Sequence, residues 1–144
     1  MPDCDIVLAP RDEVLALAAA CSEGRRVDHL ELPQEGLWLM QMREPVRGDG
    51  WYAGEVPVGQ ACIALHDGEL GEARGGAVLM HADRELAVAA AVLDAVVRAG
   101  WPGAEEAARL RAAGAAVRAR AEAARAGILA RTRVDFSELG QEEA

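Results

Sequence analysis

Residues 55–68 read EVPVGQACIALHDG, and this stretch decides the expected fold. Its apolar side chains alternate, as they do on a strand with one buried face, at Ala61, Ile63 and Leu65. The dipeptide Asp67-Gly68 then supplies the positive φ angles that a two-residue hairpin turn needs. The stretch therefore predicts a strand that turns back into an antiparallel partner.

Two strands are predicted around this turn. The first spans 55–65, where Pro57 and Gly59 indicate an edge position or a bulge. The second spans 69–80, and we expect an interruption near Gly75-Gly76. The two form a hairpin that a further strand can extend.

A third strand is predicted before the hairpin. The sequence LWLMQM at 37–42 alternates large apolar with mixed residues, and the polar residues before it predict a connector. The sequence EPVRGDG at 44–50 predicts a loop, because Pro and Gly interrupt strands. The expected sheet is a three-stranded antiparallel meander.

Helices are expected before and after the meander in the sequence. The sequence RDEVLALAAACS predicts a helix over 11–22, which ends before Gly24. Asp83 is the predicted N-cap of a second helix over 84–99, and Gly100 ends it. In both segments the apolar residues recur at the helical period, so each helix has a side suited to burial.

The last helix is predicted over 103–126, where Ala and Arg dominate, with Pro102 in its first turn. Mostly small residues follow one seam of it: Leu110, Gly114, Val117, Ala121, Ala124 and Ile128. Such a seam packs either on the chain's own sheet or on another protein. Residues 131–144 are expected to form an extended tail of a single domain that covers 1–144.

The predicted fold class is therefore α+β. An N-terminal helix comes first, then the antiparallel β meander, two C-terminal helices and the extended tail.

Composition excludes several kinds of partner. The chain has 144 residues, a net charge of −9 and 15 basic residues, all of them Arg. A surface of that sign repels nucleic acid and anionic lipid.

No basic-then-apolar signal segment opens the chain and no 18-residue apolar run is free of charges, so we expect a cytoplasmic protein. Because 31 residues are Ala, the core is expected to be thin for this length.

Several kinds of active site lack the residues they need. Without Lys, neither a phosphate-binding P-loop nor a Schiff base can form. The hydroxyl groups, none of them in a nucleophile elbow, belong to Tyr52, Ser22, Thr132 and Ser137. The cysteines, which form no C-x-x-C pair, are Cys4, Cys21 and Cys62. The glycine-rich stretch at 68–76 does not match the dinucleotide-binding pattern.

Histidine and carboxylate pairs are the remaining candidates for chemistry. His81 with Asp83, and His66 with Asp67, each offer two metal ligands, but the spacing predicts no third. One alternative is a small stand-alone enzyme that uses His81, Asp83 and Asp94. We expect no self-sufficient set of catalytic, cofactor-binding or metal-binding residues.

Two neighbouring stretches carry a family resemblance. PQEGLWLMQMR at 33–43 and GDGWYAGE at 48–55 resemble the phosphonate carbon–phosphorus lyase system protein PhnG family. The residues that match its pattern are Glu35, Gly36, Leu37, Arg43, Gly50, Tyr52, Gly54 and Glu55.

Two later stretches extend the resemblance along the chain. LAVAAAVLDAV at 86–96 is similar to the family's Ala-rich helix, and TRVDF at 132–136 is its most specific match. The chain departs from the family at His81-Ala82-Asp83, where Gly-Arg-Asp is usual, and its stretch 72–79 looks longer.

The resemblance implies a non-catalytic accessory subunit of the carbon–phosphorus lyase core complex. It implies PhnI-, PhnH- and PhnJ-like partners in a twofold hetero-oligomer. That complex transfers a phosphonate to the ribose C1 of ATP and releases adenine, which yields α-D-ribose 1-methylphosphonate 5-triphosphate. No cofactor is implied on this chain itself; ATP, and later an iron–sulfur/S-adenosylmethionine subunit, belong to the complex.

The Trp51-Tyr52 pair suits a contact with such a partner. Large amphipathic side chains are enriched at interfaces, and Gly54 allows a second backbone to come close. A plug in the chain's own hairpin core is the alternative, and a structural oligomerisation module is an alternative for the whole chain. The residues expected to contact a partner are Trp51, Tyr52, Gly54, Glu55, Asp94, Arg133, Val134, Asp135 and Phe136.

Overall fold

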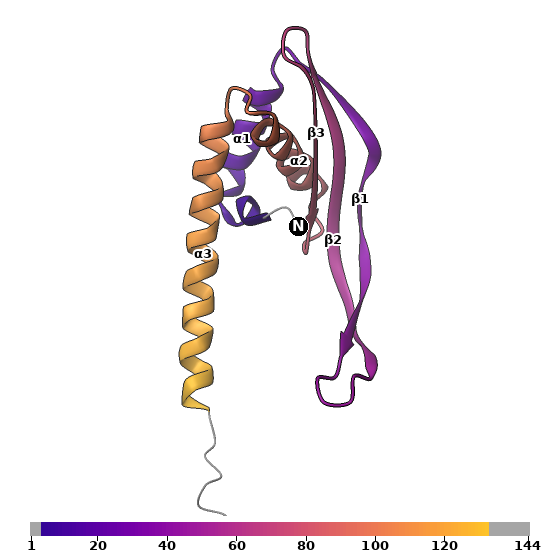
Figure 1. Cartoon of the computed structure of the whole chain (residues 1–144), viewed down its shortest axis with the longest axis vertical. Coiled ribbons are helices and arrows are strands. Elements are labelled where there is room, and N and C mark those ends of the chain that lie inside the picture. Colours follow the sequence, from indigo (N-terminus) through magenta and orange to yellow (C-terminus); the bar gives the residue numbers. More distant parts are fainter. Residues whose placement is uncertain (1–3, 133–144) are drawn as a thin grey trace, which may run out of the picture.

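The structure, a computed structural model, describes residues 4–132 and has helices on one side of a long twisted sheet (Figure 1). In chain order its elements are the 3-10 helix η1 (Cys4–Leu8), α1 (Arg11–Ser22), β1 (Arg26–Arg43), β2 (Gly50–Asp67), β3 (Gly71–Leu79), α2 (Arg84–Ala99) and α3 (Ala104–Arg131). The predicted α+β class and the antiparallel meander are confirmed. The sequence pattern did not predict η1.

The sheet has three strands at one end and two at the other. β2 lies in the middle, in the order β1-β2-β3. β1 pairs with β2 along its whole length, as far as Arg43 opposite Gly50. β3 pairs with the second half of β2 only, and its last pair is Leu79 with Gly59. Residues 36–43 of β1 and 50–58 of β2 therefore form a two-stranded extension, which we call the distal ribbon (Figure 1).

β1 is much longer than the strand predicted over 37–42. It begins at Arg26, in the segment expected to be a polar connector. Pairing with β2 holds this polar stretch in the sheet, with register shifts between His29 and Glu31 and between Glu31 and Gln34. A polar strand on a sheet edge gives no clean alternation, because part of each face meets water. The predicted loop at 44–50 is confirmed as the tip of the ribbon, although Gly50 itself begins β2.

The turn between β2 and β3 differs from the predicted two-residue hairpin. Asp67 pairs with Gly71, which leaves three residues in the loop. The positive φ falls on Gly71, at 87°, and not on Gly68. The Asp67 carboxylate accepts hydrogen bonds from the N–H groups of Glu69 and Leu70, at 2.9 and 3.1 Å, and so stabilises the longer turn.

β3 runs without a break through Gly75-Gly76, so the predicted interruption is wrong. The glycine at 75 serves the packing instead. A Cβ atom there would overlap the backbone of α2 at Ala91 and Ala95. The absence of a side chain thus lets the central helix lie directly on the strand.

The two shorter helices have the predicted bounds. The Asp83 carboxylate accepts a hydrogen bond from the N–H of Leu86 at 2.9 Å, as an N-cap does. Gly100, at φ 66°, ends α2 in the left-handed conformation. α2 lies between α1 and the sheet, and the largest fully buried side chains of the core are Ile63, Leu65, Leu93, Val14 and Val96.

α3 begins after Gly103 and continues to Arg131, five residues beyond its predicted end. Arg131, expected to begin the extended tail, is the last residue of the helix. In the seam of small residues Gly114 is buried, and it packs against η1 and not against the sheet. Farther along the helix Val117 and Ile128 are exposed.

An ion pair joins η1 to α3. The Asp5 carboxylate is 5% exposed and pairs with Arg118. The buried charge is acceptable because the guanidinium lies beside it. The second half of α3 then projects past the core toward the same end of the molecule as the distal ribbon, with α3 on the left and the ribbon on the right of the view (Figure 1).

Candidate functional site

The distal ribbon exposes large apolar side chains on both faces. On one face Trp38 pairs with Val56, and Met42 with Trp51; on the other, Gln41 pairs with Tyr52. The side chains with more than half of their surface exposed are Leu37 (63%), Trp38 (51%), Leu39 (58%), Trp51 (52%) and Tyr52 (63%). Clustered exposed apolar residues of this size are typical of an interaction surface.

The segment WYAGE lies inside β2 and not before it, because β2 begins at Gly50. Its aromatic side chains are exposed, so the alternative in which they plug the chain's own core is wrong. Glu55 is also exposed and pairs with Leu39 on β1. The structure thus brings four of the predicted contact residues, Trp51, Tyr52, Gly54 and Glu55, together on the ribbon.

Gly54 has a conformation that other residues rarely adopt. Its φ is 132°, and a Cβ atom there would meet no heavy atom within 4 Å. Met40 pairs with Gly54 and Gln41 with Tyr52, so Ala53 is an extra residue without a partner on β1. Gly54 is therefore required by this bulge and its backbone angle, and not by crowding.

A groove of about 1270 Å³ lies beside the ribbon. Trp38, Val56 and Val58 line it from the sheet, and Leu79 lines it where β3 ends. Leu8 of η1 and Arg118 of α3 line it from the helical side. The groove thus extends from the exposed ribbon to the elements that pack around the core.

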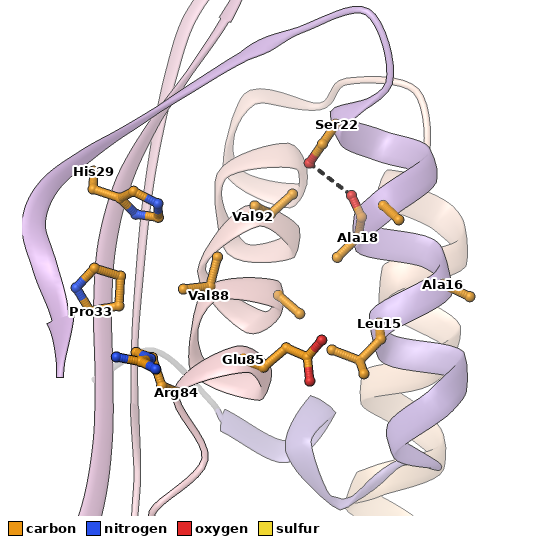
Figure 2. Close-up of a pocket in the computed structure, with 12 residues that line it drawn as sticks. Leu15, Ala16, Ala18, Ser22, His29, Pro33, Arg84, Glu85, Val88 and Val92 are labelled. Carbon is orange, nitrogen blue, oxygen red and sulfur yellow. Dashed lines mark hydrogen bonds between the residues drawn. The ribbon is translucent and has the colours of Figure 1, made fainter. Parts of the chain in front are cut away.

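A second, shallower pocket of about 700 Å³ lies between α1, α2 and β1 (Figure 2). His29 and Pro33 extend from β1 toward Val88 and Val92 of α2. The hydroxyl of Ser22 donates to the carbonyl oxygen of Ala18 at 2.9 Å, within its own helix. This hydroxyl is thus engaged by its helix, and the pocket presents chiefly an apolar floor.

The residues of the stand-alone enzyme alternative are not assembled into one site. Asp83 accepts from the Arg11 guanidinium at 2.8 Å, and this contact, with the cap hydrogen bond, lowers the pKa of the Asp83 carboxyl. Asp94 accepts from the N–H of Gly76 at 3.2 Å and from Arg98 at 2.8 Å. Eleven positions separate the two carboxylates, which is about 16 Å along a helix. Both are occupied by structural contacts.

His66 and Asp67, which together offer two possible metal ligands, have different partners. His66 lies 3.0 Å from the Asp28 carboxylate and 3.9 Å from that of Glu72, so one residue from each strand takes part. Asp67 instead pairs with Arg25 at 2.9 Å. Among residues 4–132, no group of three or more His, Cys, Asp or Glu side chains could hold a metal ion.

The remaining contact candidates stand apart from the ribbon. Asp94 is on α2, with its side chain only 11% exposed. Arg133, Val134, Asp135 and Phe136 lie outside the described residues.

Comparison with known families identifies the chain. The family model for phosphonate metabolism protein PhnG matches residues 6–140. The chain belongs to the PhnG family. The match takes in the whole sheet, the distal ribbon and all of α3. The resemblance inferred from its motifs is thereby confirmed.

Membership of the PhnG family gives the chain a role in phosphonate metabolism, and suggests that it belongs to a phosphonate metabolism complex. No curated protein matches the chain. Within residues 4–132, no helix is long and apolar enough to cross a membrane.

Sequence reasoning missed the β1 half of this PhnG surface. Leu37, Trp38 and Leu39 were interpreted as an ordinary strand, yet all three are exposed. The signal was present in the pattern. Consecutive large apolar residues place apolar side chains on both faces of a strand. Such a strand is expected to be covered on both faces.

Proposed function

We propose that this PhnG-family chain is a non-catalytic accessory subunit of the carbon–phosphorus lyase core complex. In that role it supports transfer of a phosphonate to the ribose C1 of ATP, with release of adenine, during the catabolism of organic phosphonates. Family membership supports the metabolic setting. The shape and exposure of the distal ribbon support the role of a docking subunit.

The observation that carries the proposal is the ribbon's two apolar faces. A two-stranded ribbon is marginally stable in water unless something packs on it. Trp38, Trp51 and Tyr52 are each about half exposed. Covering the exposed half of such a ring removes roughly 100 Å² from water, which is about 2 kcal/mol at 25 cal/mol per Å². A partner that covers all three gains enough for a specific complex.

The proposed partners are PhnI-, PhnH- and PhnJ-like subunits in a twofold hetero-oligomer. ATP binds to the assembled complex, and the iron–sulfur/S-adenosylmethionine chemistry of the later step belongs to another subunit. This division suits the contacts that already occupy the carboxylates of Asp83 and Asp94. Their role here is to hold α1, α2 and the sheet together.

Reconstitution tests this division of labour. The chain alone, the partner subunits alone and the mixture are each given ATP and methylphosphonate, and released adenine is measured. We expect adenine from the mixture at a rate well above that of the partners alone, and none from the chain alone. Turnover by the isolated chain would support the stand-alone enzyme instead.

Measuring the oligomeric state of the isolated chain tests the remaining alternative, in which the chain is a structural oligomerisation module. A subunit completed by other proteins binds PhnI-like partners through the ribbon. If the chain forms a stable homo-oligomer and does not bind these partners, it is an oligomerisation module.

A further inference from the structure

The second half of α3 has no cover among residues 4–132. Gly114 is buried against Asp5 of η1, whereas every residue from Ala116 to Arg131 is exposed. Most of the stability of a helix in a protein comes from packing of one of its faces. We call residues 116–131 the α3 arm, and its exposure on all sides raises the question of what packs on it.

The two halves of the arm surface differ. Val117, Ile128 and Leu129 are 52%, 64% and 57% exposed, and with about 3.6 residues per turn they fall on one half of the helix. The opposite half, centred near Ala119, carries only Ala and Gly apart from Glu122. All the arginines of the arm lie on the half with the large apolar residues. They are Arg118, Arg120, Arg125 and Arg131.

The arginine-bearing half of the arm faces the side on which the sheet lies. η1 lies on this side of α3 (Figure 1), and Gly114 packs against it. Arg125 follows Gly114 by about three turns and so has the same direction. Arg118 pairs with Asp5 of η1, and it lines the large groove together with Leu39 of the ribbon. The groove therefore begins between the arm and the distal ribbon.

The ribbon presents an apolar and acidic face toward the helices. The Glu35 carboxylate accepts a hydrogen bond from the N–H of Arg84, at the start of α2, at 2.8 Å, so this side chain lies on the helical side of the sheet. Leu37 and Leu39 share that face because they follow at every second position. Glu55 pairs with Leu39 and lies there too. Arm and ribbon thus turn exposed apolar groups toward the same space, with basic groups on the arm and acidic groups on the ribbon.

The arm is a basic surface on an acidic chain. The net charge of the whole chain is −9. Arg118 is already paired with Asp5, and the other three arginines of the arm, less its one glutamate, Glu122, leave a charge of +2. A second copy of the arm has the same charge and is repelled. Nucleic acid and anionic lipid are repelled by the rest of the chain, so the complementary surface is that of a protein with exposed carboxylates.

We propose that the α3 arm is a second docking element, which binds an acidic and partly apolar surface of the same subunit that covers the distal ribbon. Val117 and Ile128 pack on apolar groups of that surface, and Arg120 and Arg125, on either side of them, pair with its carboxylates. Arm and ribbon project toward the same end of the molecule, so one inserted partner contacts both (Figure 1). This inference rests on the proposed function, because it adds a contact to the same partner.

Charge variants test the arm, with binding of a purified PhnI-like subunit measured by calorimetry at low and at high salt. Arg120→Ala/Arg125→Ala removes two positive charges from the docking half. Ala119→Glu/Ala126→Glu lowers the net charge equally on the opposite half. We expect the first pair to weaken binding about tenfold and to reduce its salt dependence, and the second pair to leave the affinity unchanged. If the natural chain and the first pair bind equally well, the inference is overturned.

A second pair of variants tests the apolar part of the contact. Ile128→Asp places a charge on the docking half, so it should weaken binding of the subunit. Ala130→Asp adds the same charge two positions away on the opposite half and should bind like the natural chain. Circular dichroism should show the same helix content in both, because both positions are exposed. Equal binding by the two variants would contradict docking through this half.

Hydrogen exchange separates this inference from the proposed function. With a saturating PhnI-like subunit, we expect the amides of 118–131 to exchange about tenfold more slowly than in the isolated chain. Protection of ribbon residues 50–58 alone would overturn the arm contact and leave the accessory role intact. Absence of binding by the natural chain would overturn both. Protection of the arm in the isolated chain that fades on dilution would mean that a second copy covers it, which also overturns the inference.

Discussion

A Cβ atom on Gly75 would overlap the carbonyl oxygen of Ala91, because β3 and α2 cross there backbone against backbone. This contact sets the depth at which α2 lies on the sheet. It also explains how a chain with so many alanines forms a dense core. Close approach of backbones, and not large side chains, fills the space between these two elements.

Gly75→Ala is therefore expected to lower the free energy of unfolding by about 3 kcal/mol, at the upper end for an overpacked core. Urea unfolding followed by tryptophan fluorescence measures the change. Gly76→Ala is the matched control, since its Cβ would lie 3.5 Å from the nearest atom, the carbonyl oxygen of Ala61. Equal effects of the two changes would contradict the close crossing.

Gly114→Ala should detach the first half of α3 from η1. A Cβ at this position would overlap the carbonyl oxygen of Asp5, so we expect a loss of about 2 kcal/mol. Gly127→Ala lies in the same helix with nothing within 4 Å and should stabilise it by about 0.5–1 kcal/mol. Thermal unfolding followed by circular dichroism should show shifts of opposite sign; two shifts of the same sign would refute this packing.

Asp67 is expected to make stability depend on pH in acid. Hydrogen bonds from Arg25 and from two backbone N–H groups lower the pKa of its carboxyl to about 2. A lowered carboxyl pKa stabilises the fold fully above the unfolded value of about 3.9, and this contribution is lost as pH falls through the folded value. Between pH 4 and 2, unfolding midpoints should therefore fall more steeply for the natural chain than for Asp67→Asn.

Asp67→Asn is a conservative change because the amide oxygen can still accept from the turn. The two chains should differ most above pH 5 and converge near pH 2. Asp49→Asn removes the same formal charge at the exposed ribbon tip, away from this turn, and serves as the control for the loss of charge alone. If the unfolding midpoints of Asp67→Asn and of the natural chain change with pH in the same way, the Asp67 carboxylate does not make this contribution to stability.

The fold was predictable where local signals decide it. Asp83 and Gly100 mark the ends of α2, and the structure keeps both as caps. Local signals failed where tertiary contacts decide. Gly75 looked like a strand breaker because the crossing helix is not visible in the sequence, and the polar start of β1 is a strand only because β2 pairs with it.

The candidate site was predictable in part. Trp51 and Tyr52 stood out as a rare aromatic pair, and the structure leaves both exposed. The contribution of Trp38 could not be derived, because whether an apolar strand is covered depends on how far its neighbours extend. Here β3 ends at Leu79, opposite Gly59, and that end exposes the ribbon.

Binding of a purified PhnI-like subunit tests the account most directly. The double variant Trp51→Ala/Tyr52→Ala removes two exposed rings, so it should melt like the natural chain but elute apart from the subunit. Leu70→Ala changes an apolar residue that is 47% exposed, in the turn at the opposite end of the sheet, and this variant should still co-elute. If the double variant co-elutes normally with the subunit, the distal ribbon is not the docking surface.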